Sequence, residues 1–346
     1  MGTRVGDNQL PAVDLFAGAG GLSLGLEQAG FSIVRAVEFD RDAAATYSMA
    51  HPATTVCVND IADLSFSDLR GRVALVAGGP PCQPWSSGGL RRAEDDPRNG
   101  LPQFLRVIEE TRPEAVLMEN VAGLAAGSRR PYLDAFMARL EQLGFTVRLT
   151  VLAAPAYGVP QKRVRLFVVA TRGSAAQVPP PSHGPGTSLR FRPAGEVIAS
   201  TPTGAPNRAI VTYARNPDLR PDPYDGHLFN GGGRPIDLAK PSPTLLASMG
   251  GNKTPWVDTL GVVPSYHRHL RAGGAPRNGL VPGARRITVE EASLLQGFPP
   301  SARFAGPRSS QYRQVGNAVP PPLAAAVARQ LATALSPRTA AEAAAS

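Results

Sequence analysis

Residues 12–29 read AVDLFAGAGGLSLGLEQA, an apolar run, a glycine-rich turn and a helical stretch in direct succession. We expect a buried strand over Ala12–Phe16 and a helix over Leu22–Ala29. The glycines let the backbone approach a ligand closely and leave the first N–H groups of the helix free to bind it. This stretch predicts an α/β fold with a ligand site at the end of its first strand.

Apolar runs and helical stretches continue to alternate from Pro11 to Arg172. The expected strands are Ser32–Val37, Val73–Ala77, Ala115–Met118, Thr146–Leu152 and Val164–Ala170, and the expected helices are Asp42–Met49, Gln103–Thr111 and Tyr132–Leu143. Strands that alternate with helices predict a Rossmann-like, mostly parallel sheet with helices on both faces. Ligands of such sheets bind beyond the carboxyl ends of the strands.

The composition changes near Gly173, where a tract rich in Pro, Gly and Arg begins. It shows no sustained helical period as far as Gly283. The tract is either disordered or a small loop-rich domain with β pieces, and its scattered Val, Ile, Leu, Trp and Tyr residues favour the domain. A short helix with a capping box over Thr288–Gln296 and an Ala-rich helix over Pro322–Ala334 follow.

The composition also excludes several classes of protein. The 346 residues carry 36 Lys and Arg against 27 Asp and Glu, a formal charge of +9, and nearly all the basic residues are Arg, which suits a phosphate-bearing partner. Only Cys57 and Cys82 are present, so a disulfide scaffold and a cysteine-based zinc site are excluded. His267 and His269 lack partner ligands, so no metal is expected. With no long apolar run and no secretory signal, we expect a cytoplasmic protein without a membrane span.

Two acids follow the next strands at positions that suit a nucleoside ligand. Glu38 closes the second strand 18 residues beyond Gly20, where a carboxylate can bind both ribose hydroxyls. Asp60, after the third strand, can accept a hydrogen bond from an adenine amino group. The dinucleotide fingerprint needs a third glycine where this chain has Ser23, which argues against NAD. The alternative interpretation is a glycine turn followed by two solvated acids.

A cysteine in a stiff loop follows the next strand. Residues 78–86 read GGPPCQPWS, which places Cys82 between prolines beyond a strand's carboxyl end. A lone cysteine is most often a small buried hydrophobe, an account that suits Cys57 in its strand. A proline loop flanked by glycines is a poor core segment, so Cys82 is a candidate nucleophile in its thiolate form.

Charged side chains are expected at the same edge of the sheet. Glu119 ends another parallel strand, so it should emerge beside Cys82. Residues 161–165 read QKRVR and begin the following strand, where two-residue alternation places Arg163 and Arg165 on one face. The sequence thus predicts a cysteine, a carboxylate and two arginines around one site.

These motifs, in this order, resemble those of the cytosine-5 DNA methyltransferases of bacterial restriction–modification systems. The matching segments are DLFAGAGG (14–21), PPCQ (80–83), ENV (119–121), QKRVR (161–165), RITVEEASLLQGFP (286–299) and QVGNAVP (314–320). They span the chain from about Ala12 to Ala334 except for the variable region. Any one motif is weak evidence, whereas the ordered set is highly specific.

The resemblance implies duplex DNA held between a catalytic domain (residues 1–172 and 310–336) and a target-recognition domain (residues 173–309), with a flexible tail over residues 337–346. Its last helix should return to pack beside the first strands. The methyl donor is expected to be S-adenosylmethionine, in a site lined by Phe16, Gly18, Gly20, Gly21, Leu22, Glu38, Phe39, Asp60, Ile61, Pro80 and Asn317. Phe39 stands where the family often has Trp. We expect a monomer, accompanied by a restriction endonuclease that acts separately.

The resemblance also implies covalent catalysis. Addition of the Cys82 thiolate to carbon 6 of cytosine makes carbon 5 reactive, while Glu119 hydrogen-bonds ring nitrogen 3. Arg163 and Arg165 bind the exocyclic oxygen and hold Glu119 or the thiolate in place. The cytosine must flip out of the duplex, and a loop over residues 86–100 closes over the DNA. The residues expected to contact DNA are Gln83, Ser86, Arg91, Arg98, Asn252 and Lys253.

Other functions stay open at this point. Methylation of carbon 5 of cytosine in RNA uses the same catalytic core, but the variable region lacks the Cys-Phe-Thr segment of the tRNA-modifying relative. A catalytically silent DNA-binding module explains the charge but not an intact set of Cys82, Glu119 and Arg163 beside a cofactor loop. A Rossmann oxidoreductase is disfavoured by Ser23 and leaves the proline-flanked cysteine unexplained.

Overall fold

The computed structural model describes residues 9–81, 100–198, 205 and 207–335. The chain separates into two compact units: the first comprises Met1–Ala153, Val164–Pro181 and Val319–Ser346, and the second Ala154–Arg163 and Ser182–Ala318. Residues 310–318, which we expected in the catalytic domain, group with the second unit. The catalytic and recognition roles of the two units remain predictions. No helix in the described ranges is long and apolar enough to cross a membrane.

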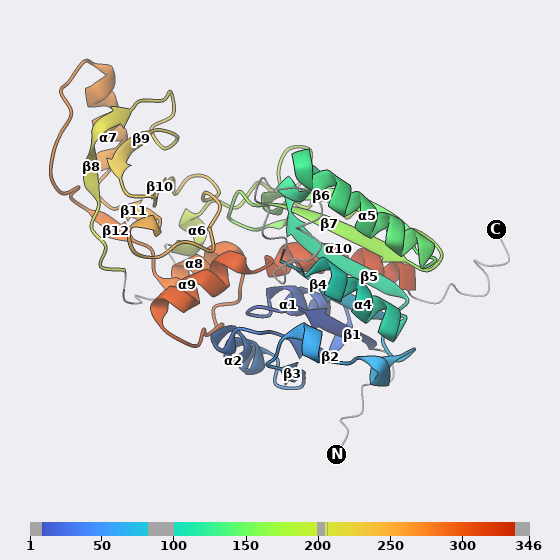
Figure 1. Cartoon of the computed structure of the whole chain (residues 1–346). Helices are drawn as coiled ribbons and strands as arrows, with labels where there is room; N and C mark the ends of the chain where they lie inside the picture. Colours follow the sequence, from blue (N-terminus) through green and yellow to red (C-terminus); the bar gives the residue numbers. More distant parts are fainter. Residues whose placement is uncertain (1–8, 82–99, 199–204, 206, 336–346) are drawn as a thin grey trace. The chain divides into compact units, whose positions relative to one another are not determined.

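A seven-stranded sheet forms the centre of the first unit (Figure 1). The strands are β1 (Leu10–Leu15), β2 (Phe31–Val37), β3 (Thr55–Cys57), β4 (Leu75–Gly78), β5 (Ala115–Val121), β6 (Thr146–Ala153) and β7 (Val164–Thr171). Their order is β3-β2-β1-β4-β5-β7-β6, and β7 runs antiparallel to both its neighbours, whereas the other pairs are parallel. The central strands β1, β4 and β5 are mostly apolar and mostly buried because helices cover both faces. The predicted mostly parallel α/β sheet is confirmed.

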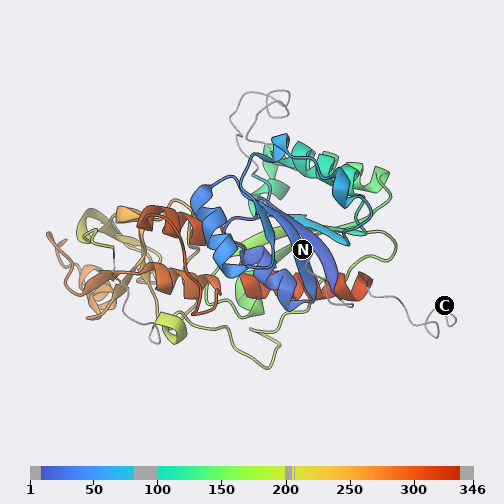
Figure 2. The same ribbon diagram turned by 90° about the horizontal axis from the view of Figure 1, so that it is seen from below.

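The first unit surrounds this sheet with helices. They are α1 (Gly21–Gln28), α2 (Arg41–Ala50), α4 (Leu101–Thr111), α5 (Arg130–Gln142) and α10 (Pro321–Leu335). Figure 2 shows α4 and α5 on one face of the sheet and α1 and α10 on the other. A Cβ on Gly25 of α1 would lie only 2.4 Å from the Cβ of Ala324, so glycine permits the close contact between α1 and α10. The last helix therefore returns to the region of the first strand, as predicted.

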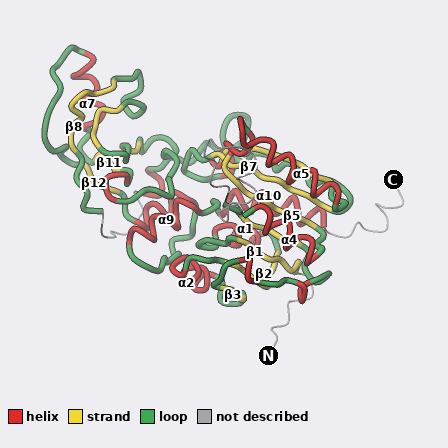
Figure 3. Tube along the Cα trace, viewed as in Figure 1, coloured by secondary structure: helices red, strands yellow, loops and turns green. Residues whose placement is uncertain are grey.

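Short strands and helices build the second unit (Figure 3). One sheet contains β10 (Pro235–Ile236), β11 (Trp256–Asp258) and β12 (Ala284–Arg286), another contains β8 (Thr212–Asp218) and β9 (His227–Asn230), and the helices are α6 (Gly195–Ile198), α7 (Val262–Arg271), α8 (Val289–Gln296) and α9 (Arg308–Asn317). Tyr213, Phe229, Trp256 and Tyr266 pack together, with ring centroids 4.8 to 5.9 Å apart. This aromatic core supports the loop-rich domain over the disordered alternative.

The sequence predicted α8 and missed α7. At the start of α8 the Glu291 N–H donates to the Thr288 hydroxyl at 3.1 Å, and the Thr288 N–H donates to the Glu291 carboxylate at 2.8 Å, which is the predicted capping box. α7 lies in the tract where we expected no helix, and that expectation was wrong. Its N-cap is Gly261, which offers no side-chain signal, and packing of Val263 and Tyr266 in the aromatic core stabilises it instead.

Candidate active site

The glycine turn between β1 and α1 lies against the end of β2. Phe16, Gly18 and Gly20 have φ angles of 57°, 56° and 83°, a left-handed region that favours glycine and strains Phe16. The Gly18 and Asp40 N–H groups each donate to one oxygen of the Glu38 carboxylate at 2.8 Å. Burial raises the pKa of Glu38, and these hydrogen bonds oppose the shift. The turn and the acid predicted to bind ribose therefore hold one another in place.

The surface around this turn has the groups that a nucleoside requires. Each oxygen of Glu38 has one backbone donor and can accept a further hydrogen bond. The Phe39 side chain is 74% exposed, so its ring is open to stacking. Asp60 is exposed and caps the 3-10 turn η1 (Ile61–Asp63), with its Oδ1 2.9 Å from the Ala62 nitrogen. Because β3, β2 and β1 are neighbours in the sheet, these residues follow adjacent strands.

A buried polar network joins β1 to α1 and α2 next to the turn. The Ser23 hydroxyl donates to Asp14 Oδ2 at 2.6 Å and lies 2.6 Å from the Tyr47 hydroxyl. Burial raises the pKa of Asp14 to about 7, although the hydrogen bond from Ser23 lowers it. Ser23, which the sequence marked only as a missing glycine, thus has a structural role of its own. No sequence pattern predicts that Tyr47 lies beside Ser23.

His51 of the α2 C-terminus completes this network. Its Nδ1 lies 2.8 Å from Glu27 Oε1, and its Nε2 lies 3.2 Å from the Gly20 carbonyl oxygen. A Cβ on Gly20 would approach His51 Nε2 to 2.4 Å, so the position excludes any larger residue. The Gly20 carbonyl, at the end of the glycine turn, is therefore fixed by an imidazole that sequence analysis did not single out.

The backbone on either side of residues 82–99 is anchored in the first unit. The Gly100 N–H donates to the Pro81 carbonyl at 3.0 Å. A Cβ on Gly100 would lie 2.8 Å from the Phe16 ring, so this anchor contacts the glycine turn. The predicted site residues that belong to the segment, and so lie outside the described residues, are Cys82, Gln83, Ser86, Arg91 and Arg98.

The end of β5 brings an acid to the same anchor. The Asn120 side chain donates to the Pro80 carbonyl at 2.9 Å, and a Cβ on Gly79 would lie 3.3 Å from Glu119 Oε2. Arg165 on the adjacent strand β7 forms an ion pair with Glu119 at 2.9 Å. Burial lowers the pKa of Arg165, and the charge of Glu119 opposes this shift. The structure therefore brings Glu119 and Arg165 together beside the loop that leads to Cys82.

Arg163 departs from its predicted place. β7 begins one residue later, so Arg163 and Arg165 do not alternate on one strand, and that expectation was wrong. The Arg163 side chain is buried in the second unit and donates at 2.9 to 3.1 Å to the carbonyl oxygens of Leu245, Gly316 and Ala318. Buried carbonyl groups need donors, which explains the direction of the guanidinium. These contacts hold the backbone on both sides of Asn317, whose side chain is exposed.

In the second unit, Asn252 and Lys253 lie on an exposed 3-10 turn, η6 (Gly251–Lys253). A second glycine loop, residues 231–233, packs against this turn through a 3.0 Å hydrogen bond from the Gly233 N–H to the Asn252 carbonyl. The buried Arg286 donates to the carbonyl oxygens of Ala209, Ile210, Gly233 and Thr254. One arginine thus supports both loops, a role that its sequence motif did not reveal.

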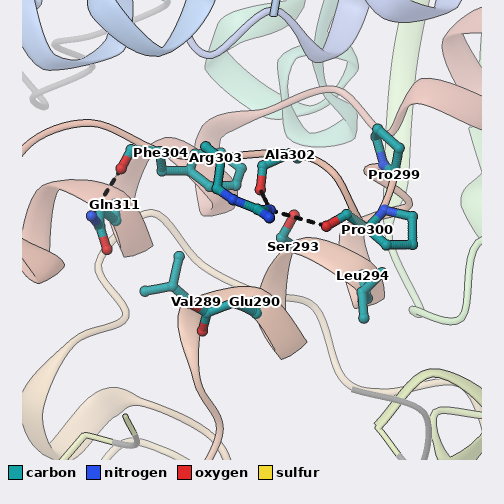
Figure 4. Close-up of a pocket in the computed structure, with 10 residues that line it drawn as sticks. All are labelled: Val289, Glu290, Ser293, Leu294, Pro299, Pro300, Ala302, Arg303, Phe304 and Gln311. Atoms are coloured by element: carbon teal, nitrogen blue, oxygen red, sulfur yellow. Dashed lines mark hydrogen bonds between the residues drawn. The ribbon is translucent and has the colours of Figure 1, made fainter. Parts of the chain in front are cut away.

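A pocket of about 430 Å³ lies beside α8 and α9 in the second unit (Figure 4). Arg303 donates to the carbonyl oxygens of Pro300 and Ala302 at 3.1 and 2.9 Å, and Gln311 donates to that of Phe304 at 2.9 Å. None of its lining residues belongs to the predicted site. Among the described residues, no group of three or more His, Cys, Asp or Glu could hold a metal ion.

Comparison of the sequence with known proteins gives a family. Residues 10–196 and 257–333 match the family described as C-5 cytosine-specific DNA methylase. The Type II methyltransferase M.AplI of Arthrospira platensis is 35% identical over 337 residues, which cover 94% of this chain and 86% of the relative. The Type II methyltransferase M1.HphI of Haemophilus parahaemolyticus is 34% identical over 331 residues, with 92% and 86% covered.

Solved structures share the fold. The S. pombe Dnmt2 methyltransferase has a TM-score of 0.69 at 17% identity, with 95% of this chain and 99% of that chain covered. A protein described as a DNA modification methyltransferase encoded within a prophage (E. coli) has a TM-score of 0.68 at 20% identity, with 95% and 100% covered. Such low identities establish the fold alone, whereas the sequence matches extend over most of the chain at higher identity. The chain belongs to the C-5 cytosine-specific DNA methylase family.

Proposed function

We propose that this methyltransferase modifies carbon 5 of one cytosine within a specific short sequence of duplex DNA, through a covalent bond to Cys82. The observation that carries the proposal is the meeting of three segments in the first unit. The anchor at Pro81 and Gly100 contacts Phe16 of the glycine turn, and the residue before it, Pro80, is held at the end of β5. A nucleophile loop, an acid and a cofactor turn at one sheet edge suit group transfer.

S-adenosylmethionine fits the residues around the glycine turn and would supply the methyl group. Glu38 accepts from the ribose hydroxyls, and Phe39 stacks on the adenine. Asp60 accepts from the adenine amino group. At Gly18 and Gly20 the backbone can approach the ligand closely, because glycine has no side chain.

Cys82 performs the covalent step. Its thiolate forms a bond to carbon 6 of the flipped cytosine, and the electron pair displaced from the ring double bond makes carbon 5 nucleophilic. Carbon 5 then takes the methyl group from the sulfonium donor. Loss of the carbon 5 proton and cleavage of the bond between carbon 6 and sulfur restore the thiolate and the aromatic ring.

Glu119 and the two arginines have separate roles. Glu119 hydrogen-bonds ring nitrogen 3 as negative charge develops in the ring. Arg165 holds Glu119 in position through its ion pair and binds the exocyclic oxygen. The contacts of Arg163 favour a positioning role, because its guanidinium donates to the carbonyl oxygens of the two residues next to Asn317.

The second unit reads the DNA. Its exposed turn at Asn252 and Lys253 contacts base edges in the major groove and the phosphate backbone. The relatives are named Type II methyltransferases, and we extend the same type to this chain. In that role it acts as a monomer and protects its target from an endonuclease that acts separately.

Trapping of the covalent intermediate tests this proposal. Duplex DNA with 5-fluorocytosine carries fluorine where the proton leaves, so elimination stops and the adduct persists. With S-adenosylmethionine present, we expect a stable protein–DNA adduct that peptide mass spectrometry maps to Cys82. The Cys57→Ser variant is the matched control and should form the adduct normally. Absence of the adduct, or its location at Cys57, would overturn the proposal.

A further inference from the structure

Arg106 of α4 forms hydrogen bonds with the backbone of the segment that follows Asp60. Its Nη2 donates to the Ile61 carbonyl at 2.7 Å, and its Nη1 donates to the Leu64 carbonyl at 3.0 Å. Ile61 is the first residue of η1, and Leu64 directly follows it. The guanidinium reaches the two carbonyls with two separate nitrogens in a fixed plane, whereas lysine would have to reach both from one ammonium nitrogen.

Glu110, one turn further along α4, completes this contact. Its Oε1 pairs with Arg106 at 2.5 Å, and its Oε2 accepts the Phe66 N–H at 2.7 Å. Both charged side chains are about two-thirds buried or more, so water weakens their hydrogen bonds less than at an open surface. We call Arg106 and Glu110 the α4 clamp. It binds three backbone groups of the segment between β3 and β4.

We propose that the α4 clamp positions the adenine end of the methyl-donor site and thereby sets the affinity for the adenosyl group. The inference rests on the proposed function, in which Asp60 and Ile61 contact the adenine. Asp60 Oδ1 already accepts the Ala62 N–H at 2.9 Å, so the direction of its carboxylate depends on η1. The clamp holds η1 through the Ile61 carbonyl, and it acts on the ligand through the direction of the Asp60 carboxylate.

The same helix offers a matched control. Glu109, the residue before Glu110, accepts from two nitrogens of Arg139 at 2.6 and 2.9 Å. This pair joins α4 to α5 and not to the segment after Asp60. Arg139→Ala therefore removes an arginine–carboxylate pair from the same helix without disturbing η1.

Binding of S-adenosylhomocysteine to the full-length protein, measured by titration calorimetry without DNA, tests the inference. We expect Arg106→Ala and Arg106→Lys to weaken binding by about 10-fold or more, and Arg139→Ala to change it by less than about twofold. Circular dichroism checks that each variant is folded. If Arg106→Ala fails to fold, Glu110→Gln replaces it, because it keeps the side-chain shape and removes the ion pair. Equal affinity of the wild type and the clamp variants would overturn the inference.

A double-mutant cycle separates positioning from general stabilisation. With the Asp60 carboxylate removed by Asp60→Ala, Arg106→Ala should cause less than about a further twofold loss, because the clamp acts through Asp60. Independent, multiplying losses in the double variant would contradict the inference. If the wild type itself fails to bind S-adenosylhomocysteine, the proposed donor site is wrong, and the inference falls with it.

Discussion

The two units hold their site residues by different means. In the first unit, the carboxyl ends of β2 and β5 and the start of the antiparallel strand β7 present Glu38, Glu119 and Arg165 at one edge of a regular sheet. In the second unit, strands are short, and the buried guanidinium groups of Arg163 and Arg286 donate to loop carbonyls instead. A sheet places side chains by its topology, whereas a unit built from loops needs internal donors for its unpaired backbone.

The largest effect should come from the acid at the sheet edge. Glu119→Gln keeps the shape of the side chain but replaces the carboxyl group, which pairs with Arg165 when ionised and can give a proton to ring nitrogen 3 when protonated, with an amide that does neither. We expect the single-turnover methyl-transfer rate to fall by about 10³-fold, with DNA affinity changed by less than about threefold. Rapid-quench experiments measure the methyl-transfer rate, and filter binding measures the DNA affinity. An unchanged rate would refute the role of Glu119.

Removal of the Arg286 guanidinium, which donates hydrogen bonds inside the second unit, should lower the free energy of unfolding. Arg286→Leu leaves four carbonyl groups without this donor, of which those of Gly233 and Thr254 are buried, so we expect a loss of roughly 3–5 kcal/mol in the free energy of unfolding. Arg220→Leu, which removes an exposed ion pair with Asp218, should cost less than about 1 kcal/mol. Urea denaturation followed by tryptophan fluorescence measures both, since Trp256 is buried in this unit. Equal losses would contradict the distinction between the units.

The buried acid of the first unit should make stability depend on pH. Asp14 has a pKa of about 7 when folded and about 3.8 when unfolded, so the folded protein binds the extra proton between these values. Its contribution to stability is therefore fully present below about pH 4 and is lost as the pH rises to about 7. We expect this loss to be about 2–4 kcal/mol. In Asp14→Asn, denaturation curves over this range should lack that decline, and an identical decline would show that other groups cause it.

Smaller effects are expected at the exposed turn of the second unit. Lys253→Ala should weaken binding to all DNA sequences by about 10-fold and make it less sensitive to salt. Asn252→Ala should cost about 1–3 kcal/mol for the target sequence and relax the preference at one base pair. Competition binding with single-base variants of the target distinguishes the two results. A uniform loss for Asn252→Ala would remove it from base recognition.

The sequence predicted the features that follow from periodicity and chain order. Alternating strands and helices located the glycine turn, Glu38, Asp60 and Glu119 at one end of the sheet. The family resemblance implied that Arg163 and Arg165 hold Glu119 or the thiolate, but the ion pair of Arg165 with Glu119 depends on β7 lying antiparallel beside β5, a strand order that the sequence did not predict.

Contacts between residues distant in the chain could not be predicted in this way. Arg163 lies one residue before β7 and binds carbonyls more than 80 residues away, so local alternation misplaced it. Ser23, His51 and Arg106 have their roles only because α1, α2 and α4 pack where they do. α7 is stabilised by packing in an aromatic core that no local sequence pattern predicts.

Transfer of labelled methyl groups tests the central claim most directly. The full-length protein is incubated with methyl-labelled S-adenosylmethionine and either duplex DNA of mixed sequence or tRNA, and modified positions are mapped by bisulfite sequencing. We predict 5-methylcytosine at one short motif of the duplex and no label in tRNA. Label in tRNA alone, or on an atom of DNA other than carbon 5 of cytosine, would contradict the account.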